Sequence, residues 1–262
     1  MNLTSLKGRT ALVTGASSGL GSDFARHLAE AGCHLVLTAR REELLKALQQ
    51  ELSERHGVRV EVVALDLGAP GAPDQLYERL AADGIEIDVL VNNAGFGLYG
   101  DFLDIPWERE RAMLELDILA LVHLTKRFAK DMVARKFGYI LQVSSIGAYQ
   151  PTPTYASYSA AKSFVLSFGE ALNHELKGTG VSCTVLSPGV TATAFLEVSG
   201  QAPTFYQRLA MMRSPEVTRI GLQALLRRQS SVVPGLLNAV TAWSTRLMPR
   251  PFAAAVAHRL MR

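Results

Sequence analysis

The feature that most constrains the fold of this 262-residue sequence is an alternation of short apolar runs with longer amphipathic segments. Runs of β-branched and apolar residues without polar alternation are typical of strands buried on both faces of a parallel sheet. Alternating strands and helices predict a doubly wound α/β fold with helices on both faces of a parallel sheet. The predicted strands are 10–14, 34–38, 60–65, 89–93, 139–144 and 182–187, and the helices between them are 19–31, 42–56, 73–83, 107–135 and 155–178.

A single domain accounts for the whole sequence. A further predicted helix at 214–229 precedes a seventh short strand at 231–234, so we expect a sheet of about seven strands. The joins are short and contain glycine or proline, and no linker-like, repeated or low-complexity tract interrupts the pattern. Residues 1–262 are therefore predicted to form one domain.

The N-terminal residues and the cysteines bear on the compartment. The sequence MNLTSLKGRTALVTG continues into the first strand without a charged and then apolar leader. No apolar run reaches the roughly 18 residues that a membrane span needs. Cys33 and Cys183 lie in apolar runs, which predicts buried thiols in neighbouring strands and a reducing compartment. We expect a cytoplasmic protein.

A glycine-rich turn links the first strand to the first helix, with the sequence TGASSGLG at 14–21. Glycines allow a tight turn that comes close to a pyrophosphate, and the N–H groups and positive dipole end of the following helix favour phosphate. The position of this turn indicates a Rossmann-type dinucleotide site more strongly than its spacing does. The residues expected to contact the cofactor are Gly15, Ser17, Ser18, Gly19, Leu20 and Gly21.

The end of the second strand bears on which dinucleotide binds. Such sites often place an acid there to accept from the ribose 2′-hydroxyl, but this strand is followed by Arg40 and Arg41. An arginine can bind a 2′-phosphate and stack on adenine. We therefore expect NADP(H) in preference to NAD(H), with Arg40 as the favoured contact. The alternative is that both arginines begin a solvated helix.

Further short motifs follow in a fixed order: D66-L67, N92-N93-A94-G95, S144-S145, Y158-S-A-A-K162 and P188-G189-V-T-A-T193. Together with the glycine turn, from about residue 7 to residue 195, they resemble the short-chain dehydrogenase/reductase family. The wider sequence looks most like the bacterial reductase branch described as DltE-like. The resemblance implies cofactor contacts beyond the glycine turn, at Asp66, Leu67, Asn93, Ala94, Gly95, Tyr158, Lys162, Pro188, Gly189, Val190 and Thr193.

The resemblance also implies catalytic roles. Tyr158 would exchange a proton with the substrate oxygen, Ser145 would hold that oxygen, and Lys162 would position the nicotinamide ribose. A phenol titrates near 10 in water, so the Lys162 ammonium and an oxidised nicotinamide are expected to lower the pKa of Tyr158. Tyr155 has no partner of this kind and is expected to line the pocket or to pack.

Position 117 departs from the family pattern. The family has a catalytic asparagine in the long helix before the fifth strand, and here the stretch reads LELDILAL with Asp117. An aspartate can accept from the water that the asparagine is thought to hold, but it is normally ionised and donates nothing. It could pair with Lys162 and weaken its influence on Tyr158. We expect Asp117 to be compatible with turnover. Alternatively, it supports a helix kink, or the protein turns over poorly.

The sequence after Thr193 departs from the family, and its charge changes. Residues 195–213 are a candidate substrate lid, with apolar side chains that favour an apolar substrate. Residues 201–262 carry nine arginines and one acid, whereas the first 200 residues have a net charge of −5. Within 236–262, apolar residues recur at helical spacing beside arginines, which fits packing on the domain, packing on a second subunit, or peripheral membrane contact.

These features predict an NADP(H)-dependent oxidoreductase that interconverts a ketone or aldehyde with an alcohol, acting on a small apolar substrate. The alternative is a non-catalytic or weakly active NADP(H)-binding sensor or scaffold of the same fold. The resemblance implies a homodimer or homotetramer through the helices at 107–135 and 155–178. Nucleic-acid binding is disfavoured by the negative first 200 residues, and the histidines show no metal-ligand spacing.

Overall fold

The predicted parallel sheet is present and has seven strands. The computed structural model describes residues 3–261 except 193–198, 202–203, 205–207 and 209. All strands run parallel in the order β3-β2-β1-β4-β5-β6-β7. Their bounds are β1 (Thr10–Thr14), β2 (His34–Ala39), β3 (Val60–Ala64), β4 (Val89–Asn92), β5 (Gly138–Val143), β6 (Val181–Leu186) and β7 (Ser231–Val232).

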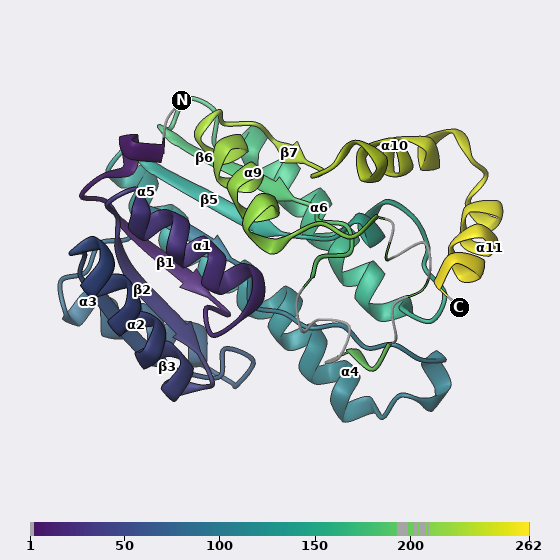
Figure 1. Ribbon diagram of the computed structural model, residues 1–262, viewed down its shortest axis with the longest axis horizontal. Coiled ribbons are helices and arrows are strands. Elements are labelled where there is room, and N and C mark those ends of the chain that lie inside the picture. The colour runs from purple at the N-terminus through teal and green to yellow at the C-terminus, as the bar shows by residue number, and fades with distance from the viewer. Residues whose placement is uncertain (1–2, 193–198, 202–203, 205–207, 209, 262) are drawn as a thin grey trace.

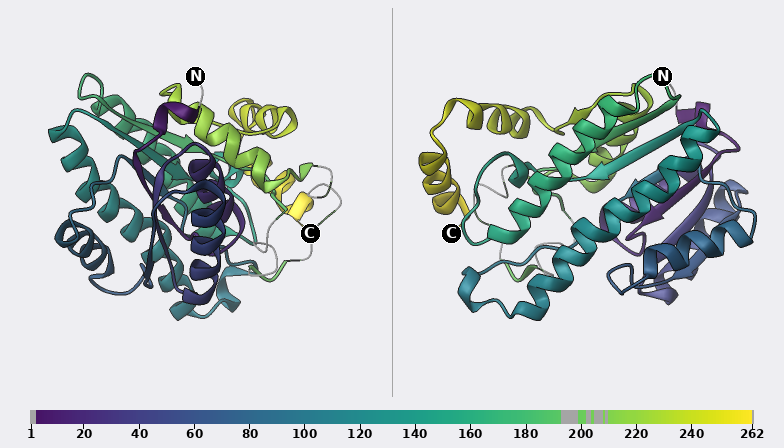
Figure 2. Two further views of the ribbon diagram at one scale, coloured as in Figure 1. Left: turned by 60° about the vertical axis from the view of Figure 1, so that its left-hand side comes forward. Right: turned by 180° about the vertical axis from the view of Figure 1, so that it is seen from behind.

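Helices cover both faces of the sheet and form a three-layer sandwich (Figures 1 and 2). One buried cluster joins the sheet to α1 (Gly19–Glu30), α2 (Glu42–His56) and α9 (Ser214–Leu226). The other joins it to α3 (Ala72–Ala82), α5 (Leu121–Ala134) and α6 (Ala156–Glu175). Because both faces are covered, most strand residues are apolar and buried, which explains the absence of alternation in the sequence.

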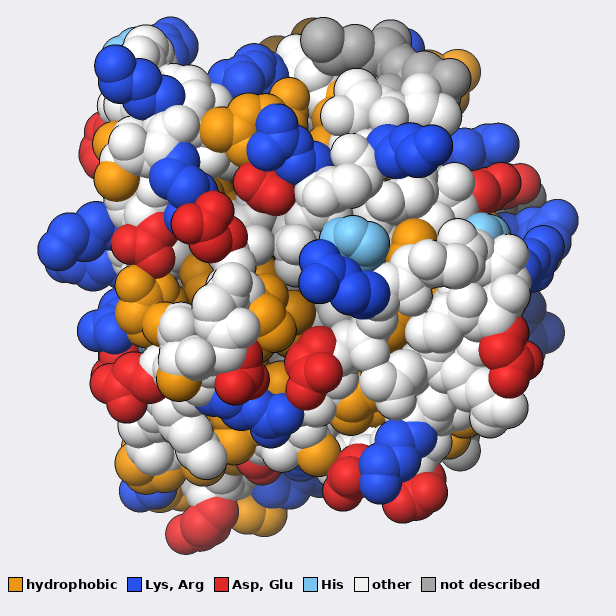
Figure 3. Space-filling view, turned by 90° about the vertical axis from the view of Figure 1, so that its left-hand side faces the viewer, with side chains coloured by type: hydrophobic (Ala, Val, Ile, Leu, Met, Phe, Trp, Pro, Cys, Tyr) orange, Lys and Arg blue, Asp and Glu red, His pale blue; other side chains and the backbone are white. Residues whose placement is uncertain are grey.

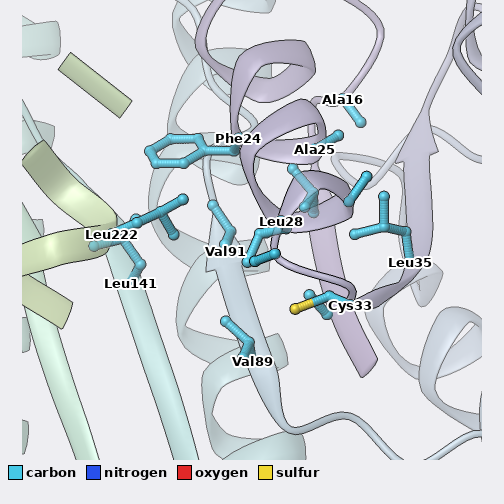
Figure 4. Close-up of a cluster of buried hydrophobic side chains, with 14 of the residues drawn as sticks. Ala16, Phe24, Ala25, Leu28, Cys33, Leu35, Val89, Val91, Leu141 and Leu222 are labelled. Atoms are coloured by element: carbon cyan, nitrogen blue, oxygen red, sulfur yellow. The ribbon is translucent and has the colours of Figure 1, made fainter. Parts of the chain in front are cut away.

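Neighbouring residues of one strand enter opposite clusters. Val13 of β1 points to the α1 side, whereas the adjacent Leu12 points to the α3 and α5 side. Figure 4 shows the first cluster, where Phe24 of α1 lies near Leu222 of α9 and Leu141 of β5. These contacts hold the first helix, and therefore the turn before it, in a fixed position on the sheet.

The predicted helix at 107–135 is two helices. Between α4 (Trp107–Leu114) and α5, the six residues Glu115–Ala120 form a π-helical turn. Single π turns inside helices are often found at functional sites. Here the turn contains Asp117, whose side chain is fully buried. The regular α-helix is therefore interrupted at position 117, where a helix kink was one of the alternatives.

An arm made of α10 (Leu236–Ser244) and α11 (Arg250–Met261) leaves the body after β7 and bends back at α11 (Figures 1 and 2). Leu236, Val240, Trp243 and Leu247 form an apolar stripe on α10 and the following turn, and all four are exposed. The stripe therefore does not pack on its own domain. Among the described residues, no helix is both long and apolar enough to cross a membrane.

The two cysteines correct one expectation. Both are free and fully buried, as predicted. However, Cys33 directly precedes β2 and Cys183 lies in β6, and three strands separate β2 from β6 in the sheet. The prediction of neighbouring strands was wrong, because similar apolar runs give no information on strand order.

The edge of the molecule formed by α2, β3 and α3 carries mixed charge. Acidic and basic side chains lie next to each other on this face (Figure 3). Arg79 of α3, for example, pairs with Glu61 of β3 at 2.9 Å. This face presents no field of a single sign that could attract nucleic acid.

Candidate active site

The carboxyl ends of the strands carry the predicted functional residues. In a doubly wound sheet, ligands bind beyond these ends, where the strand order reverses. The reversal lies here between β1 and β4. Loops after β1, β4, β5 and β6, together with α6, line one continuous cavity. The predicted residues that it brings together are Gly15, Ser18, Gly19, Leu20, Asn93, Ala94, Gly95, Ser145, Tyr158, Lys162, Pro188, Gly189 and Val190.

The glycine turn has the geometry that a pyrophosphate requires. Gly15 has φ +66°, and a Cβ there would lie 2.9 Å from the Cα of Ala94. A Cβ on Gly21 would overlap the Gly15 carbonyl oxygen. Ser18 caps α1 without a side-chain hydrogen bond, so the first N–H groups of the helix remain available to an anion. These residues fit a dinucleotide.

The turn is held against the end of β4 by Thr14. The Thr14 hydroxyl accepts hydrogen bonds from the backbone N–H groups of Asn93 and Ala94, each at 2.9 Å. In return, Asn93 Nδ2 donates to the Thr14 carbonyl at 2.9 Å. Sequence reasoning did not assign Thr14 a role, although it is the first residue of the TGASSGLG stretch.

The two arginines after β2 have different environments. Arg41 donates from Nη2 to the hydroxyls of Ser17 at 3.0 Å and Ser18 at 2.7 Å, and it thereby contacts the glycine turn. Arg40 is exposed and lies 3.9 Å from Asp66. The geometry ties Arg41 to the phosphate-binding turn more closely than Arg40, the contact favoured from sequence.

Asp66 and Leu67 follow β3 but face different surroundings. The Asp66 carboxylate is half-exposed and accepts a hydrogen bond from the Gly68 N–H at 3.1 Å. Leu67 is buried in the cluster on the α3 and α5 side. Its side chain therefore packs in the core, which leaves Asp66 and the backbone as the parts of this loop that can meet a ligand.

Ser145, Tyr158 and Lys162 all line this cavity. Tyr158 and Lys162 are one turn apart on α6, and Lys162 Nζ lies 5.7 Å from the Tyr158 ring centroid. Lys162 Nζ also donates to the Val143 carbonyl at 3.3 Å. Ser145 follows β5, and its hydroxyl accepts from the Gly147 N–H at 3.1 Å. The end of β5 and α6 thus position all three groups.

Asp117 forms a buried ion pair with Lys162. Asp117 Oδ2 lies 2.9 Å from Lys162 Nζ, and Oδ1 accepts from the Phe96 N–H at 3.0 Å. Burial raises the pKa of the Asp117 carboxyl, whereas the charge and hydrogen bond of Lys162 oppose that shift. The family's asparagine position is therefore occupied here by a carboxylate in direct contact with the lysine ammonium.

Tyr158 differs electrostatically from the expectation. Burial, followed by the negative charge of Asp117, raises the pKa of the phenol above its usual value, and a hydrogen bond with Ser145 opposes the shift. The expected lowering by Lys162 is not seen, and the Lys162 ammonium is instead paired with Asp117 at 2.9 Å. The positive charge of an oxidised nicotinamide would favour the phenolate.

The lid region can be described only in part. Thr193 and the segment 195–198, with Phe205 and Tyr206, lie outside the described residues. The end of the segment pairs with the loop after β6: the Met212 N–H donates to the Val190 carbonyl, and the Ala192 N–H donates to the Met212 carbonyl, both at 3.0 Å. The loop that contains Val190 is therefore tied to residue 212.

Tyr155, Ser199 and Gln201 form a hydrogen-bonded group next to Tyr158, and only Tyr155 was expected from the sequence to line the pocket or to pack. Tyr155 is buried, its ring centroid lies 5.7 Å from that of Tyr158, and its hydroxyl bonds to Ser199 and Gln201, both at 2.9 Å. Gln201 and Met261 line the same cavity as Tyr158. The position of Met261 in this cavity could not be predicted from the sequence, because nothing in the motif pattern links α11 to the site.

Comparisons with known proteins agree with this geometry. Residues 9–203 match the sequence profile described as short chain dehydrogenase. The chain is 32% identical over 196 residues to a 7beta-hydroxysteroid dehydrogenase of Collinsella aerofaciens, covering 75% of this chain and 74% of that one. A solved structure from work on 7beta-hydroxysteroid dehydrogenase stereoselectivity superposes with a TM-score of 0.88 at 26% identity, covering 98% and 99% of the two chains. A short-chain dehydrogenase from Sphingobium yanoikuyae in complex with NADPH gives 0.81 at 31% identity, covering 92% and 95%.

Proposed function

The chain belongs to the short-chain dehydrogenase family and is an NAD(P)-dependent oxidoreductase, and from that premise we propose that it interconverts an apolar ketone or aldehyde with an alcohol, using NADP(H). The observation that carries the proposal is that Ser145, Tyr158 and Lys162 line the same cavity as the glycine turn. The three groups would be of little use to a sensor or scaffold. The alternative, a non-catalytic cofactor-binding protein, therefore ranks second.

The proposed chemistry follows from these side chains. When bound, the nicotinamide supplies or accepts the hydride. The Tyr158 phenol donates its proton to the carbonyl oxygen during reduction, or accepts the alcohol proton during oxidation. The Ser145 hydroxyl donates a hydrogen bond to the same oxygen and stabilises its developing charge. Lys162 would hold the cofactor ribose and, together with Asp117, would keep a fixed pair of charges next to Tyr158.

The preference for NADP(H) is supported by the two arginines after β2. Their guanidinium groups lie beside the glycine turn and Asp66, where the adenosine end of a dinucleotide is expected. An arginine can bind a phosphate with two hydrogen bonds, whereas it cannot accept from a ribose hydroxyl. We therefore assign both Arg40 and Arg41 to a 2′-phosphate.

An apolar substrate is supported by the lining of the cavity near Tyr158. Phe96, Ile146, Val190 and the Tyr155 ring contribute apolar surface there, beside polar side chains such as Thr152, Ser159 and Gln201. Pockets of this kind select by shape and apolar area. The relative that acts on hydroxysteroids is consistent with such a substrate, although it is only 32% identical.

The test is oxidation of NADPH and of NADH by the purified protein across a panel of ketones and aldehydes, with Tyr158→Phe as the control. We expect turnover that favours NADPH and falls by about 10²–10⁴-fold in the variant. The proposal fails if Tyr158→Phe retains full activity. If the protein binds NADPH tightly but turns over no compound, and Asp117→Asn does not restore turnover, the sensor alternative is favoured.

We propose a homo-oligomer formed through the helical segments 107–135 and 155–178. The support is apolar surface: Trp107, Leu119 and Phe164 are 62%, 64% and 43% exposed. Sedimentation velocity should give a dimer or tetramer, and Leu119→Glu with Phe164→Glu should dissociate it. Unchanged assembly in that double variant would place the interface elsewhere.

We propose a cytoplasmic protein whose arm contacts an anionic membrane surface. The apolar stripe on α10 is exposed, Arg246 and Arg250 flank it, and no acid occurs after Glu216. In the Trp107→Phe variant, Trp243 is the only tryptophan. Its fluorescence emission should therefore shift to shorter wavelength when phosphatidylglycerol vesicles are added. Arg246→Glu with Arg250→Glu should abolish this shift, whereas Arg227→Glu should not. A shift that persists in the double variant contradicts the proposal.

A further inference from the structure

The last turn of α11 is attached to the substrate side of the cavity. Gln201 Nε2 donates to the Met261 carbonyl at 2.8 Å, and the Thr204 hydroxyl donates to the Leu260 carbonyl at 3.0 Å. The Tyr99 hydroxyl approaches the Met261 carbonyl at 3.5 Å. Carbonyls in the last turn of a helix have no partner within the helix. Side chains from two other segments therefore satisfy the end of α11.

The same contacts reach the catalytic tyrosine. The Tyr155 hydroxyl donates to Gln201 Oε1 at 2.9 Å, and the Tyr155 ring packs between Tyr99 and Tyr158, with centroid distances of 5.4 and 5.7 Å. A continuous set of contacts thus runs from Tyr158 through Tyr155 and Gln201 to α11. These contacts fix the position of the last turn of α11 relative to Tyr158.

Met261 itself lines the cavity that contains Tyr158, although more than one hundred residues separate them in sequence. A methionine has a flexible, apolar side chain that adapts to the shape of a neighbouring group. Met261 is linked to Tyr158 through Gln201 and Tyr155, whereas the glycine turn would hold the cofactor, so we place a substrate substituent beside Met261. Its neighbour in the cavity, Gln201, supplies one polar group there.

We propose that the last turn of α11 is the outer wall of the substrate pocket and that Met261 sets the size of the apolar group carried by the carbonyl substrate. This inference rests on the proposed function, and it assigns the arm a role in specificity as well as in surface contact. The wall is built from α11, Gln201 and Tyr99 and does not belong to the glycine turn or the catalytic group.

Substrate size provides the first test. We expect Met261→Ala to raise kcat/KM for a bulky fused-ring ketone about 10- to 100-fold relative to a small aliphatic ketone, because one or more methylene groups in a pocket discriminate by that amount. Met261→Trp should shift the ratio in the opposite direction. Phe252→Ala is the matched control, because Phe252 is an exposed apolar residue of the same helix. An unchanged ratio in both Met261 variants overturns the proposal.

A labelling experiment separates this proposal from the proposed function. Cys33 and Cys183 are buried, so Met261→Cys introduces the one reactive thiol expected in the native protein. With NADPH present, a bulky fused-ring ketone should slow maleimide labelling of Met261→Cys but not of Phe252→Cys. If the ketone slows labelling of Met261→Cys but the protein turns over no substrate, the proposed activity is rejected and the pocket wall at α11 is supported. If the protein turns over ketones, labelling is not slowed and the kcat/KM ratio of bulky to small ketones is unchanged in the Met261 variants, the pocket wall is rejected and the proposed activity is supported.

Discussion

Asp117 Oδ2 lies 2.9 Å from Lys162 Nζ, and both side chains are almost completely shielded from solvent. The π-helical turn Glu115–Ala120 directs the carboxylate inward, and the Phe96 N–H holds its second oxygen. A lysine ammonium next to Tyr158 would otherwise favour the phenolate. Because its charge is balanced by Asp117, we expect Lys162 to act mainly by position in the proposed reaction, and the phenol to depend more on the cofactor for its acidity.

Asp117→Asn should shift the pH dependence of alcohol oxidation to lower pH. The negative charge of Asp117 raises the pKa of Tyr158, so its removal lowers that pKa. Oxidation requires the phenolate as the base, and the acidic limb of kcat/KM should therefore move to lower pH. Glu115→Gln is the control, because Glu115 lies in the same turn but pairs with Arg111 at 3.2 Å. An acidic limb that stays in place or moves to higher pH would reject this role for Asp117.

Arg41→Ala should weaken NADPH binding more than NADH binding. Arg41 donates to the Ser17 and Ser18 hydroxyls and, in the proposed NADP(H) site, would bind the 2′-phosphate. Loss of a charge-assisted hydrogen bond costs about 1.5–3 kcal/mol, which raises the NADPH Kd by roughly tenfold or more. Calorimetric titrations with both cofactors measure this difference. Arg55→Ala, in the last turn of α2, should leave both Kd values unchanged. Arg40→Ala in parallel shows which arginine dominates.

Much of the fold could be predicted because strand burial and glycine turns leave direct marks in the sequence. The apolar strands and the helix after TGASSGLG follow from periodicity and from local backbone requirements. The π turn at Asp117 could not be predicted, since α-helical and π-helical turns share the same residue types. The separation of Cys33 from Cys183 in the sheet, and the contact of Met261 with the site, depend on tertiary arrangement, which apolar runs do not encode.

Gly21→Ala should abolish dinucleotide binding and lower the Tm. A methyl group at this position would overlap the Gly15 carbonyl oxygen, so the turn would have to open. NADPH titration and thermal unfolding measure the two effects. Gly68→Ala is a matched control, because its added Cβ would lie 3.5 Å from Asp66 Oδ1, an ordinary contact distance. Equal effects of the two substitutions would contradict the role assigned to the close approach of Gly21 to the Gly15 carbonyl.

The native protein should not react with a thiol reagent at pH 8. Burial raises the pKa of both Cys33 and Cys183 to about 12, and both side chains are fully shielded. Only the thiolate attacks disulfide reagents such as Ellman's reagent, so both protonation and access protect them. After addition of denaturant, two equivalents of thiol per chain should react. Rapid reaction of one equivalent in the native protein would show that one of these regions opens.

Phe24→Ala should destabilise the domain by about 3–5 kcal/mol, the range expected for truncating a buried phenylalanine. Phe24 is fully buried between α1 and α9, near Leu222 (Figure 4). Its loss would leave a cavity under the helix that carries the glycine turn. Urea unfolding measures the change, and Leu103→Ala is the control, since Leu103 is 92% exposed and should change stability by less than about 0.5 kcal/mol. If the two substitutions cost the same, the α1 and α9 contact does not anchor the turn.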